Sequence, residues 1–196
     1  ALKEGSLSLD DTFLVSERAW RKGGSKMYVS VNTRVNVEDL IKGVIVQSGN
    51  DASIVIAEGL AGSEPAFASE LNELAKKLSM NNSSFVNSSG WPDPDHYTTA
   101  RDLSKLARAT INNFPDYYHY YSQKIFTYSG IKQFNRNPTL YRKLGADGLK
   151  TGRTQTAGYG LTASAIRKDR RLVLVLNGLP SSKARANESA RILDWG

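Results

Sequence analysis

The stretch Gln47-Ser48-Gly49-Asn50-Asp51 decides how the chain is organised, because it separates two segments that both carry the apolar pattern of a helix. Upstream, Asn36 and the acidic Asp39 mark a helix start, and this helix is expected to end near the stretch. Its buried stripe consists of Leu40, Ile41, Val44 and Ile45. Downstream, Asp51 can cap a second helix whose body, residues 52–58, is small and apolar on every side. The pattern predicts a hydroxyl and an amide held in place between two buried helix ends.

Taken alone, Ser48-Gly49-Asn50 fits a tight turn, in which glycine supplies backbone freedom and asparagine supplies local hydrogen bonds. A catalytic interpretation gains weight further along the chain, where Lys150-Thr151-Gly152 occurs. S-[DG]-N followed by K-T-G is typical of penicillin-recognising serine enzymes, as the second and third of their three signatures. The two motifs together therefore favour an active site.

The composition is that of an ordinary globular protein: 196 residues, of which 40% are hydrophobic and 23% charged. We expect one catalytic domain over residues 1–196, since this length suffices for one substantial core. The absence of cysteine excludes disulfides, iron–sulfur clusters and a thiol nucleophile. No apolar run is long enough for a membrane span, and no signal peptide opens the stretch, so an exported protein would carry its leader outside these residues.

The net charge of +7 does not by itself indicate nucleic-acid binding. The 26 Lys and Arg residues are scattered among 19 acidic residues, without the basic runs of nucleic-acid-binding arms or recognition helices. We therefore expect no nucleic-acid partner. A basic surface would instead favour anionic envelope polymers or lipid headgroups through long-range attraction.

The remaining pattern predicts helices first and strands toward the C-terminal end, an α+β arrangement. Residues 1–5 fit the last turn of a helix stopped by Gly5, and residues 27–31 fit a short strand. Helices are expected to begin at Ser63 and Thr99, on either side of a long loop. The other expected elements are strands over residues 159–167 and 172–179 and a closing helix over residues 182–195.

A wider resemblance is carried by Gly24-Ser25-Lys26-Met27, residues 43–53, residues 98–102 and residues 147–152. It extends over nearly the whole chain through Ala157-Gly158-Tyr159, Phe126-Thr127-Tyr128 and Asn135-Arg136-Asn137. In these strings and their order, the chain resembles the D-alanyl-D-alanine carboxypeptidases of the peptidase S11 family, the low-molecular-mass penicillin-binding proteins. The resemblance implies a β-lactamase/transpeptidase-like fold, in which an antiparallel sheet packs against a helical cluster.

For function, the resemblance implies a serine-type hydrolase that removes the terminal D-alanine of peptidoglycan stem peptides. In such enzymes a serine attacks the penultimate carbonyl, D-alanine leaves, and water hydrolyses the acyl-enzyme; β-lactam antibiotics acylate the same serine. No cofactor and no metal are implied. The implied location is periplasmic or extracytoplasmic, in the cell envelope, and any membrane association would come from regions outside these residues.

One departure from the family is serious, because the nucleophile and its lysine belong to an S-x-x-K motif upstream of S-G-N that this stretch does not contain. An S-x-x-K does occur at Ser129-Gly130-Ile131-Lys132, but it follows S-G-N and is interpreted as a coincidence. We therefore expect an N-terminally incomplete domain, lacking the family's N-terminal strands and nucleophile helix. By itself it is expected not to turn over substrate.

The resemblance assigns catalytic roles to Ser48, Asn50 and Lys150. Ser48 would sit between the S-x-x-K lysine and Lys150 and relay a proton to the leaving nitrogen, which cannot depart as an amide anion. Asn50 would hold a substrate amide through its carboxamide. Lys150 would add positive charge beside Ser48, ease proton transfer and attract a carboxylate-terminated substrate. Without the other motifs, Lys150 would be interpreted as an ordinary exposed lysine.

The candidate substrate-binding residues begin on the strand that carries Lys150. Thr151 and Gly152 would lie on a sheet edge, along which the substrate backbone adds as an extra strand. Arg153 would supply a backbone N–H to the oxyanion hole, and Thr154 completes this set. Many relatives carry histidine in place of Arg153, so no role is assigned to its side chain.

Three further candidates lie elsewhere in the sequence. Arg185 matches an arginine near the start of the family's last helix, which can bind the substrate's terminal carboxylate through two hydrogen bonds; an exposed helix arginine is the alternative. Arg136 is a weaker candidate of the same kind. Ser25 fits a loop near the site or a purely structural turn.

Two alternatives on the same fold stay open. A β-lactamase would need a glutamate to activate the deacylating water; residues 68–72 resemble the E-x-x-L-N signature of class A enzymes, but Ala68 stands in the glutamate position. A non-catalytic peptidoglycan-binding derivative is supported only by the missing nucleophile. His96 and His119 have neither zinc-motif spacing nor triad partners and are expected to be structural.

Overall fold

The computed structural model describes all residues, 1–196, and these fall into two compact units. The first unit comprises Ala1–Glu73, Phe85–His96 and Gln123–Asn135, and the second comprises Leu74–Ser84, Tyr97–Ser122 and Arg136–Gly196. The division into compact units does not test the expectation of one catalytic domain over residues 1–196, which therefore stays a prediction.

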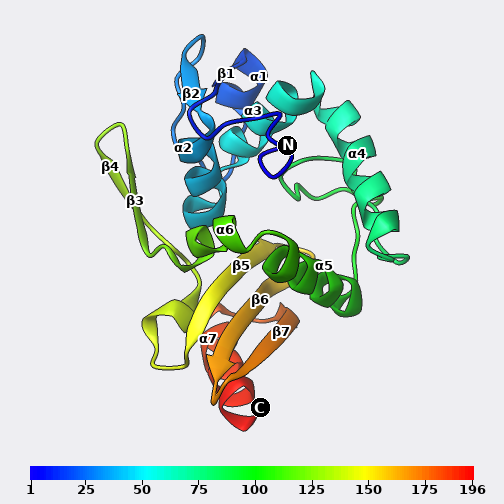
Figure 1. Cartoon of the computed structure of the whole chain (residues 1–196), viewed down its shortest axis with the longest axis vertical. Helices are drawn as coiled ribbons and strands as arrows, with labels where there is room; N and C mark the ends of the chain where they lie inside the picture. The colour runs from blue at the N-terminus through cyan, green and yellow to red at the C-terminus, as the bar shows by residue number, and fades with distance from the viewer. The chain divides into compact units, whose positions relative to one another are not determined.

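The first unit begins with two short strands and a helix (Figure 1). The strands β1 (Thr12–Leu14) and β2 (Arg34–Asn36) pair antiparallel, and the helix α1 (Glu17–Arg21) lies between them in the sequence. Asn36 then caps α2 (Val37–Lys42), because its side-chain oxygen accepts the backbone N–H of Asp39 at 2.7 Å. The predicted start of this helix is therefore confirmed.

After α2, the chain turns sharply at Ser48 and Gly49, and we call this turn the corner. A π-helical turn, η1 (Gly43–Gln47), continues α2, and α3 (Asn50–Ala61) follows after Ser48 and Gly49. Helix α4 (Glu64–Lys77) begins directly after Ser63, whose hydroxyl accepts the N–H of Ala66 at 3.3 Å. The hairpin of β3 (Ile125–Tyr128) and β4 (Ile131–Phe134) completes the unit.

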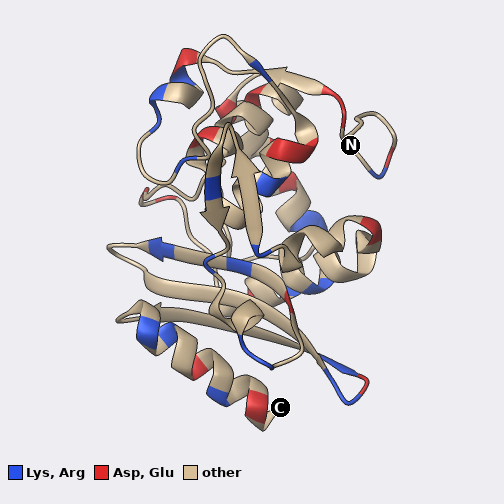
Figure 2. Cartoon of the chain, turned by 90° about the vertical axis from the view of Figure 1, so that its left-hand side faces the viewer, with Lys and Arg blue, Asp and Glu red and all other residues tan.

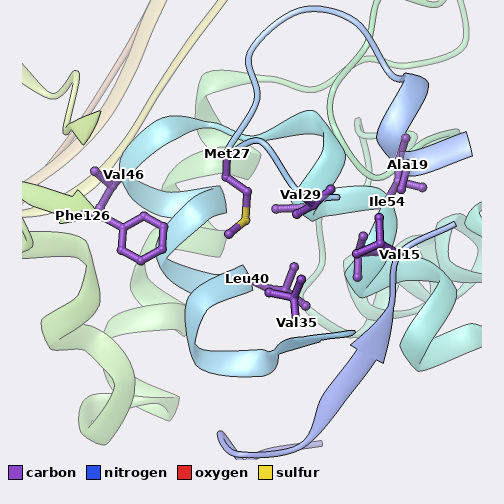
Figure 3. Close-up of a cluster of buried hydrophobic side chains, with 11 residues drawn as sticks. Val15, Ala19, Met27, Val29, Val35, Leu40, Val46, Ile54 and Phe126 are labelled. Atoms are coloured by element: carbon purple, nitrogen blue, oxygen red, sulfur yellow. The ribbon is translucent and has the colours of Figure 1, made fainter. Parts of the chain in front are cut away.

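The core of the first unit gathers apolar side chains from nearly all of these elements (Figure 3). Leu40 from α2 and Ile54 from α3 are fully buried, together with Met27 from the loop before β2. Phe126 of the hairpin joins this cluster beside Val46 of η1. The burial of both helices on either side of the corner explains why the corner is held in place.

Two expectations for the N-terminal part have different outcomes. Residues 1–6 do form a helix-end pattern: Gly5 N–H donates to Leu2 and Ser6 N–H to Ala1, and Gly5 has a φ of +73°. These are the two hydrogen bonds of a Schellman motif. The expected strand over residues 27–31 is wrong, because no ladder forms there.

The second unit is built on a three-stranded antiparallel sheet in the order β5-β6-β7. These strands are β5 (Ala146–Thr154), β6 (Gly158–Arg167) and β7 (Arg170–Leu179), and a tight turn joins the last two as the sequence predicts. Both faces of this sheet are covered by helices. Leu193 of α7 (Ser182–Trp195) packs with Leu174, whereas Ala107 of α5 (Ala100–Asn113) belongs to a cluster that contacts Val173.

The alternation of Val173 and Leu174 along β7 places α5 and α7 on opposite faces of the sheet. Thr99 caps α5 through the N–H of Asp102, as the sequence predicts. Shorter helical segments complete this unit: α6 (Pro115–Tyr118), η2 (His119–Ser122) and η3 (Pro138–Tyr141). The result is the α+β arrangement expected from the sequence, with an antiparallel sheet beside helices.

Charged residues of both signs occur along α7, as the blue and red segments in Figure 2 show. No helix in the chain combines the length and the apolar character needed to cross a membrane.

Candidate active site

Ser48 occupies a strained position where the π-helical turn η1 ends. Its backbone is left-handed, with φ 61° and ψ 40°, although it is not a glycine. Its N–H donates to the Val44 carbonyl at 3.1 Å, and the Gly49 N–H donates to the Gly43 carbonyl at 3.0 Å. Left-handed non-glycine residues and single π-helical turns both occur preferentially at functional sites. The backbone at Ser48 thus supports the functional interpretation of the S-G-N motif over an ordinary tight turn.

A loop at residues 23–25 is joined to this corner by three hydrogen bonds. The Asn50 N–H donates to the Ser25 carbonyl at 2.8 Å, and the Asn50 side-chain Nδ2 donates to the Gly23 carbonyl at 2.9 Å. In return, the Ser25 hydroxyl donates to the Gln47 carbonyl at 2.7 Å. The structure therefore brings together the predicted site residues Ser25, Ser48 and Asn50.

Asp51 does not cap α3, which corrects the expectation from the sequence. The residue before α3 is Gly49, without a side-chain cap, and Asp51 already lies inside the helix. Asp51 is 1% exposed, and its carboxylate instead accepts the backbone N–H groups of Met27, Tyr28 and Val29 at 2.9, 2.9 and 3.3 Å. Asp51 therefore fixes the segment that follows the 23–25 loop, and this long-range role leaves no local pattern in the sequence.

The second group of predicted residues lies on β5, which is an edge strand of its three-stranded sheet. Lys150 to Thr154 pair with residues 158–162 of β6 on one side only. Side chains alternate along a strand, so Thr151 and Arg153 lie on the face opposite to Lys150. A Cβ at Gly152 would meet no atom within 4 Å. No neighbour in the folded chain therefore requires a glycine there, which leaves room for a ligand backbone along this edge.

The positive charges of Arg136 and Arg185 both act on Lys150. Its ammonium donates to the Thr151 carbonyl at 3.0 Å. Burial lowers the pKa of Lys150 to about 7, and the positive charges of Arg136 and Arg185 add to this effect. An amine with this pKa exchanges a proton readily near neutral pH.

Arg185, near the start of α7, is a buried guanidinium with weak hydrogen bonds. The residue is 8% exposed, and its Nη atoms donate to the carbonyls of Gly160 and Arg136, each at 3.4 Å. Its Nε has no hydrogen-bond partner, and it forms no salt bridge. Burial lowers the pKa of Arg185, and Arg136 lowers it as well, whereas Tyr159 raises it. The predicted alternative, an exposed helix arginine, is wrong.

Tyr159 is a residue of this group to which sequence reasoning gave no role. Its ring centroid lies 5.6 Å from the guanidinium carbon of Arg185 and 5.1 Å from that of Arg153. Both arginines thus lie over one aromatic ring, which favours cations electrostatically. A signal for Tyr159 was present in the sequence, because Ala157-Gly158-Tyr159 is one of the strings in which the chain resembles the family.

Asn137, next to Arg136, is a second residue to which sequence reasoning gave no role. It is fully buried, and its Nδ2 donates to the Gly148 carbonyl of β5 at 3.0 Å. Its Oδ1 accepts the N–H and the hydroxyl of Thr139 at 3.0 and 2.7 Å. Asn137 therefore anchors the segment that carries Arg136 to the strand that carries Lys150.

The out-of-order S-x-x-K at Ser129 and Lys132 lies in the β3–β4 hairpin. Ser129 and Gly130 form the two-residue connection, with φ values of 47° and 76°. This is the geometry of a type I′ turn. Ser129 and Lys132 therefore do not share a helix face, which agrees with the interpretation of this motif as a coincidence.

The histidines take part in local contacts. The His96 ring lies edge-on to Phe85 at 5.5 Å and accepts the Val86 N–H at 3.3 Å. The His119 ring lies 4.2 Å from that of Tyr120. No group of three or more His, Cys, Asp or Glu side chains is arranged to hold a metal ion.

The predicted site residues fall into two sets. The first unit holds Ser25, Ser48 and Asn50, and the second holds Arg136, Lys150, Thr151, Gly152, Arg153, Thr154 and Arg185. Within each set, the hydrogen bonds and charges described above bring the residues together. The expected cooperation of Ser48 with Lys150 stays a prediction.

Comparison with protein families gives a clear match. The model of the Peptidase_S11 family, described as D-alanyl-D-alanine carboxypeptidase, matches residues 1–180. The chain is 41% identical over 201 residues to the D-alanyl-D-alanine carboxypeptidase DacA of Haemophilus influenzae, covering 100% of this chain and 51% of that protein. It is also 41% identical over 203 residues to DacC of Escherichia coli, again with 100% and 51% covered. The chain thus spans about half the length of these relatives.

Solved structures agree with this match. The crystal structure of penicillin binding protein 5 from Haemophilus influenzae superposes with a TM-score of 0.96 at 41% identity, covering 100% of this chain and 58% of that one. A single-residue mutant of the Streptomyces K15 DD-transpeptidase superposes with a TM-score of 0.91 at 24% identity, covering 100% of this chain and 82% of that one. The expected transpeptidase-like fold is therefore confirmed.

Proposed function

Because this chain belongs to the peptidase S11 family of D-alanyl-D-alanine carboxypeptidases, we propose that the protein removes the terminal D-alanine of peptidoglycan stem peptides. The reaction proceeds through a serine acyl-enzyme that water then hydrolyses, and β-lactams acylate the same serine. The place of action is the cell envelope outside the cytoplasm, where this substrate occurs.

The observation that carries this proposal is that Arg185 is buried without a strong hydrogen bond to its guanidinium. A buried guanidinium with two weak hydrogen bonds, an unpartnered Nε and no salt bridge is poised to receive an anion. A carboxylate fits a guanidinium through two parallel hydrogen bonds. The terminal carboxylate of a D-Ala-D-Ala peptide would supply this partner, and the nearby charges of Arg136 and Lys150 add to its attraction.

The edge strand β5 gives the substrate backbone a place to bind. Thr151 and Gly152 lie on this unpaired edge, and the open space at Gly152 allows a close approach. In our proposal, the Arg153 backbone N–H stabilises the oxyanion. Thr154, the last residue of β5, is the last of the proposed substrate-binding residues on this strand. The Arg153 side chain lies over Tyr159, so its backbone role does not depend on the side chain reaching the substrate.

Proton transfer is assigned to Ser48 and Lys150. Lys150 can hold or release a proton near neutral pH because its pKa is about 7. Ser48 is proposed to pass a proton to the departing D-alanine nitrogen, and its fixed left-handed backbone limits the directions in which its hydroxyl can lie. Asn50 is proposed to bind a substrate N–H through Oδ1, since its Nδ2 already donates to the Gly23 carbonyl.

The β-lactamase alternative receives no support from the stretch that resembles the class A signature. Ala68, which stands in the glutamate position, is buried within α4. Asn72 uses its side chain to bind the backbone of Phe85 and of Ala68. This asparagine therefore has a structural explanation, and the one carboxylate of this stretch, Glu70, is exposed on α4.

Labelling of the full-length gene product with a fluorescent penicillin tests the proposal. We expect a covalent adduct that persists for minutes to hours, mapped by mass spectrometry to the serine of an S-x-x-K motif, and release of D-alanine from a D-Ala-D-Ala peptide. Ser129→Ala should label like the wild type, because Ser129 is a turn residue. Rapid turnover of the penicillin would favour the β-lactamase, and absence of both labelling and D-alanine release would favour a non-catalytic derivative.

A further inference from the structure

We infer that Trp91, which belongs to none of the motifs described above, is a positioning residue that sets the orientation of the Asn50 carboxamide. The inference rests on the proposed role of Asn50 in binding a substrate amide. Trp91 acts through the backbone of Gly23 and Gly24, against which its ring packs.

A Cβ atom placed on Gly24 shows how close Trp91 and Asn50 come to each other. A Cβ built on Gly24 would lie 3.1 Å from Cζ3 of Trp91 and 2.6 Å from Nδ2 of Asn50. A Cβ on Gly23 would lie 4.0 Å from Cη2 of the same indole. Gly24 also has a φ of +81°, which side chains rarely adopt. Trp91 and Asn50 therefore both contact the Gly24 backbone, and only a glycine fits between them.

The same short loop is what holds the Asn50 amide. Nδ2 of Asn50 donates to the Gly23 carbonyl at 2.9 Å, which fixes the carboxamide rotation and leaves Oδ1 to accept a substrate N–H. The ammonium of Lys22, the preceding residue, lies 4.1 Å from the Trp91 ring centroid. This cation–π contact joins the loop to the indole from a second residue.

The backbone of Trp91 is itself held by hydrogen bonds. The Asn87 side chain binds the Trp91 backbone at both ends: Oδ1 accepts its N–H and Nδ2 donates to its carbonyl, each at 2.9 Å. The neighbouring Ser88 donates through its N–H and hydroxyl to Glu64 at the start of α4, at 3.1 and 2.8 Å. Glu64 in turn forms a salt bridge with Arg18 of α1 at 2.6 Å. The segment that carries Trp91 is thus hydrogen-bonded to α4 and, through Glu64, linked to α1.

Loss of the indole would let the Gly23-Gly24 loop move and would free the Asn50 carboxamide to rotate. Small displacements of positioning groups cost up to about 100-fold in rate. In the full-length gene product, we expect Trp91→Ala to lower kcat/KM for D-alanine release by about 10- to 100-fold. Trp91→Phe, which keeps a ring against the loop, should restore most of it.

The chain offers a matched control in Trp20, on α1 of the same unit. This residue is 42% exposed, against 43% for Trp91, and its ring lies 5.9 Å from the guanidinium carbon of Arg21. Trp20→Ala should leave kcat/KM within about twofold of the wild type, as expected for a surface substitution. Equal losses of activity in Trp20→Ala and Trp91→Ala would overturn the inference.

A double-mutant cycle with Asn50→Ala separates positioning from simple packing. If Trp91 acts through Asn50, Trp91→Ala should have little further effect on kcat/KM once Asn50 is alanine. Full additivity of the two losses would overturn the inference. If Trp91→Ala unfolds, the side-chain amide resonance of Asn50 in Trp91→Leu, which removes the ring but keeps an apolar side chain, replaces it; a resonance identical to that of the wild type would overturn the inference.

These outcomes are distinct from failure of the proposed function. A wild-type protein that neither binds penicillin nor releases D-alanine would refute that function, whereas the amide resonance of Asn50 tests the contact without any turnover.

Discussion

The guanidinium carbon of Arg185 lies 5.6 Å from the ring centroid of Tyr159, and the ring also lies under Arg153. Arg185 comes from α7 and Tyr159 from β6, so the packing of α7 on the sheet determines this relationship. The ring keeps a buried cation in place without neutralising it, because an aromatic face attracts a cation but removes no charge. Arg185 consequently retains its capacity to bind a carboxylate.

Arg185→Ala should therefore weaken the preference for substrates with a free C-terminal carboxylate. A hydrogen-bonded charge contributes about 1.5–3 kcal/mol, so we expect kcat/KM on a D-Ala-D-Ala peptide to fall by about 10- to 100-fold. The same peptide with a C-terminal amide should be affected far less. The measurement compares kcat/KM on the two peptides for the full-length wild type and the full-length variant.

Arg191→Ala provides the control for this comparison, since Arg191 lies on the same helix but is exposed and pairs with Glu188. It should keep the wild-type preference. An unchanged preference in Arg185→Ala would show that another group binds the carboxylate.

The lowered pKa of Lys150 predicts a pH-dependent contribution to stability. The folded chain loses the Lys150 proton near pH 7, whereas the unfolded chain keeps it up to about the ordinary value of 10.5. Between these values the unfolded state binds more protons, so the free energy of unfolding gains a component that rises with pH. Below about pH 7 both states are protonated, and the cost of the buried charge is fully present.

Lys150→Met removes this titration while keeping a long side chain. Urea unfolding of both proteins from pH 6 to pH 10 should show the variant most stabilised relative to the wild type at the acidic end, with the difference shrinking as pH rises. A difference that stays constant across this range would contradict the lowered pKa.

Asp51→Ala should strongly destabilise the first unit. The variant leaves the N–H groups of Met27, Tyr28 and Val29 without their acceptor, the first and the last of them in a buried environment, at a cost of about 3–5 kcal/mol. Urea unfolding measures the loss. Asp10→Ala, at an exposed position, should stay within about 0.5 kcal/mol of the wild type. A small effect of Asp51→Ala would mean that water replaces the carboxylate.

Gly59→Ala should destabilise the protein, although alanine normally favours a helix. A Cβ at this position of α3 would clash with the ring of Phe13, so the ring must move, at a cost of about 1–3 kcal/mol. In a Phe13→Ala background the same substitution should instead stabilise by about 0.5–1 kcal/mol, through helix propensity alone. Thermal unfolding of the four proteins measures this coupling; additive effects would show that the ring is not the obstacle.

The sequence alone predicted the features that depend on neighbouring residues. Asn36 and Thr99 cap their helices as expected, Gly5 closes a helix end, and the β6–β7 hairpin has its predicted turn. The motifs around Ser48 and Lys150 also led to the correct family. Each of these signals lies within a few residues, because caps and turns are formed by hydrogen bonds over that distance.

Only the tertiary structure decided which side chains meet across the chain. Asp51 matches a helix cap in sequence, yet its carboxylate binds residues 27–29, and the expected strand there does not form. The sequence left open whether Arg185 binds a carboxylate or is an ordinary exposed helix arginine, whereas the structure buries it beside Tyr159. Trp91 belongs to no motif, and the role that we infer for it rests on its closeness to Gly24 in the folded chain. Such contacts depend on how distant segments pack, and packing is set by the shape of the whole core rather than by any local pattern.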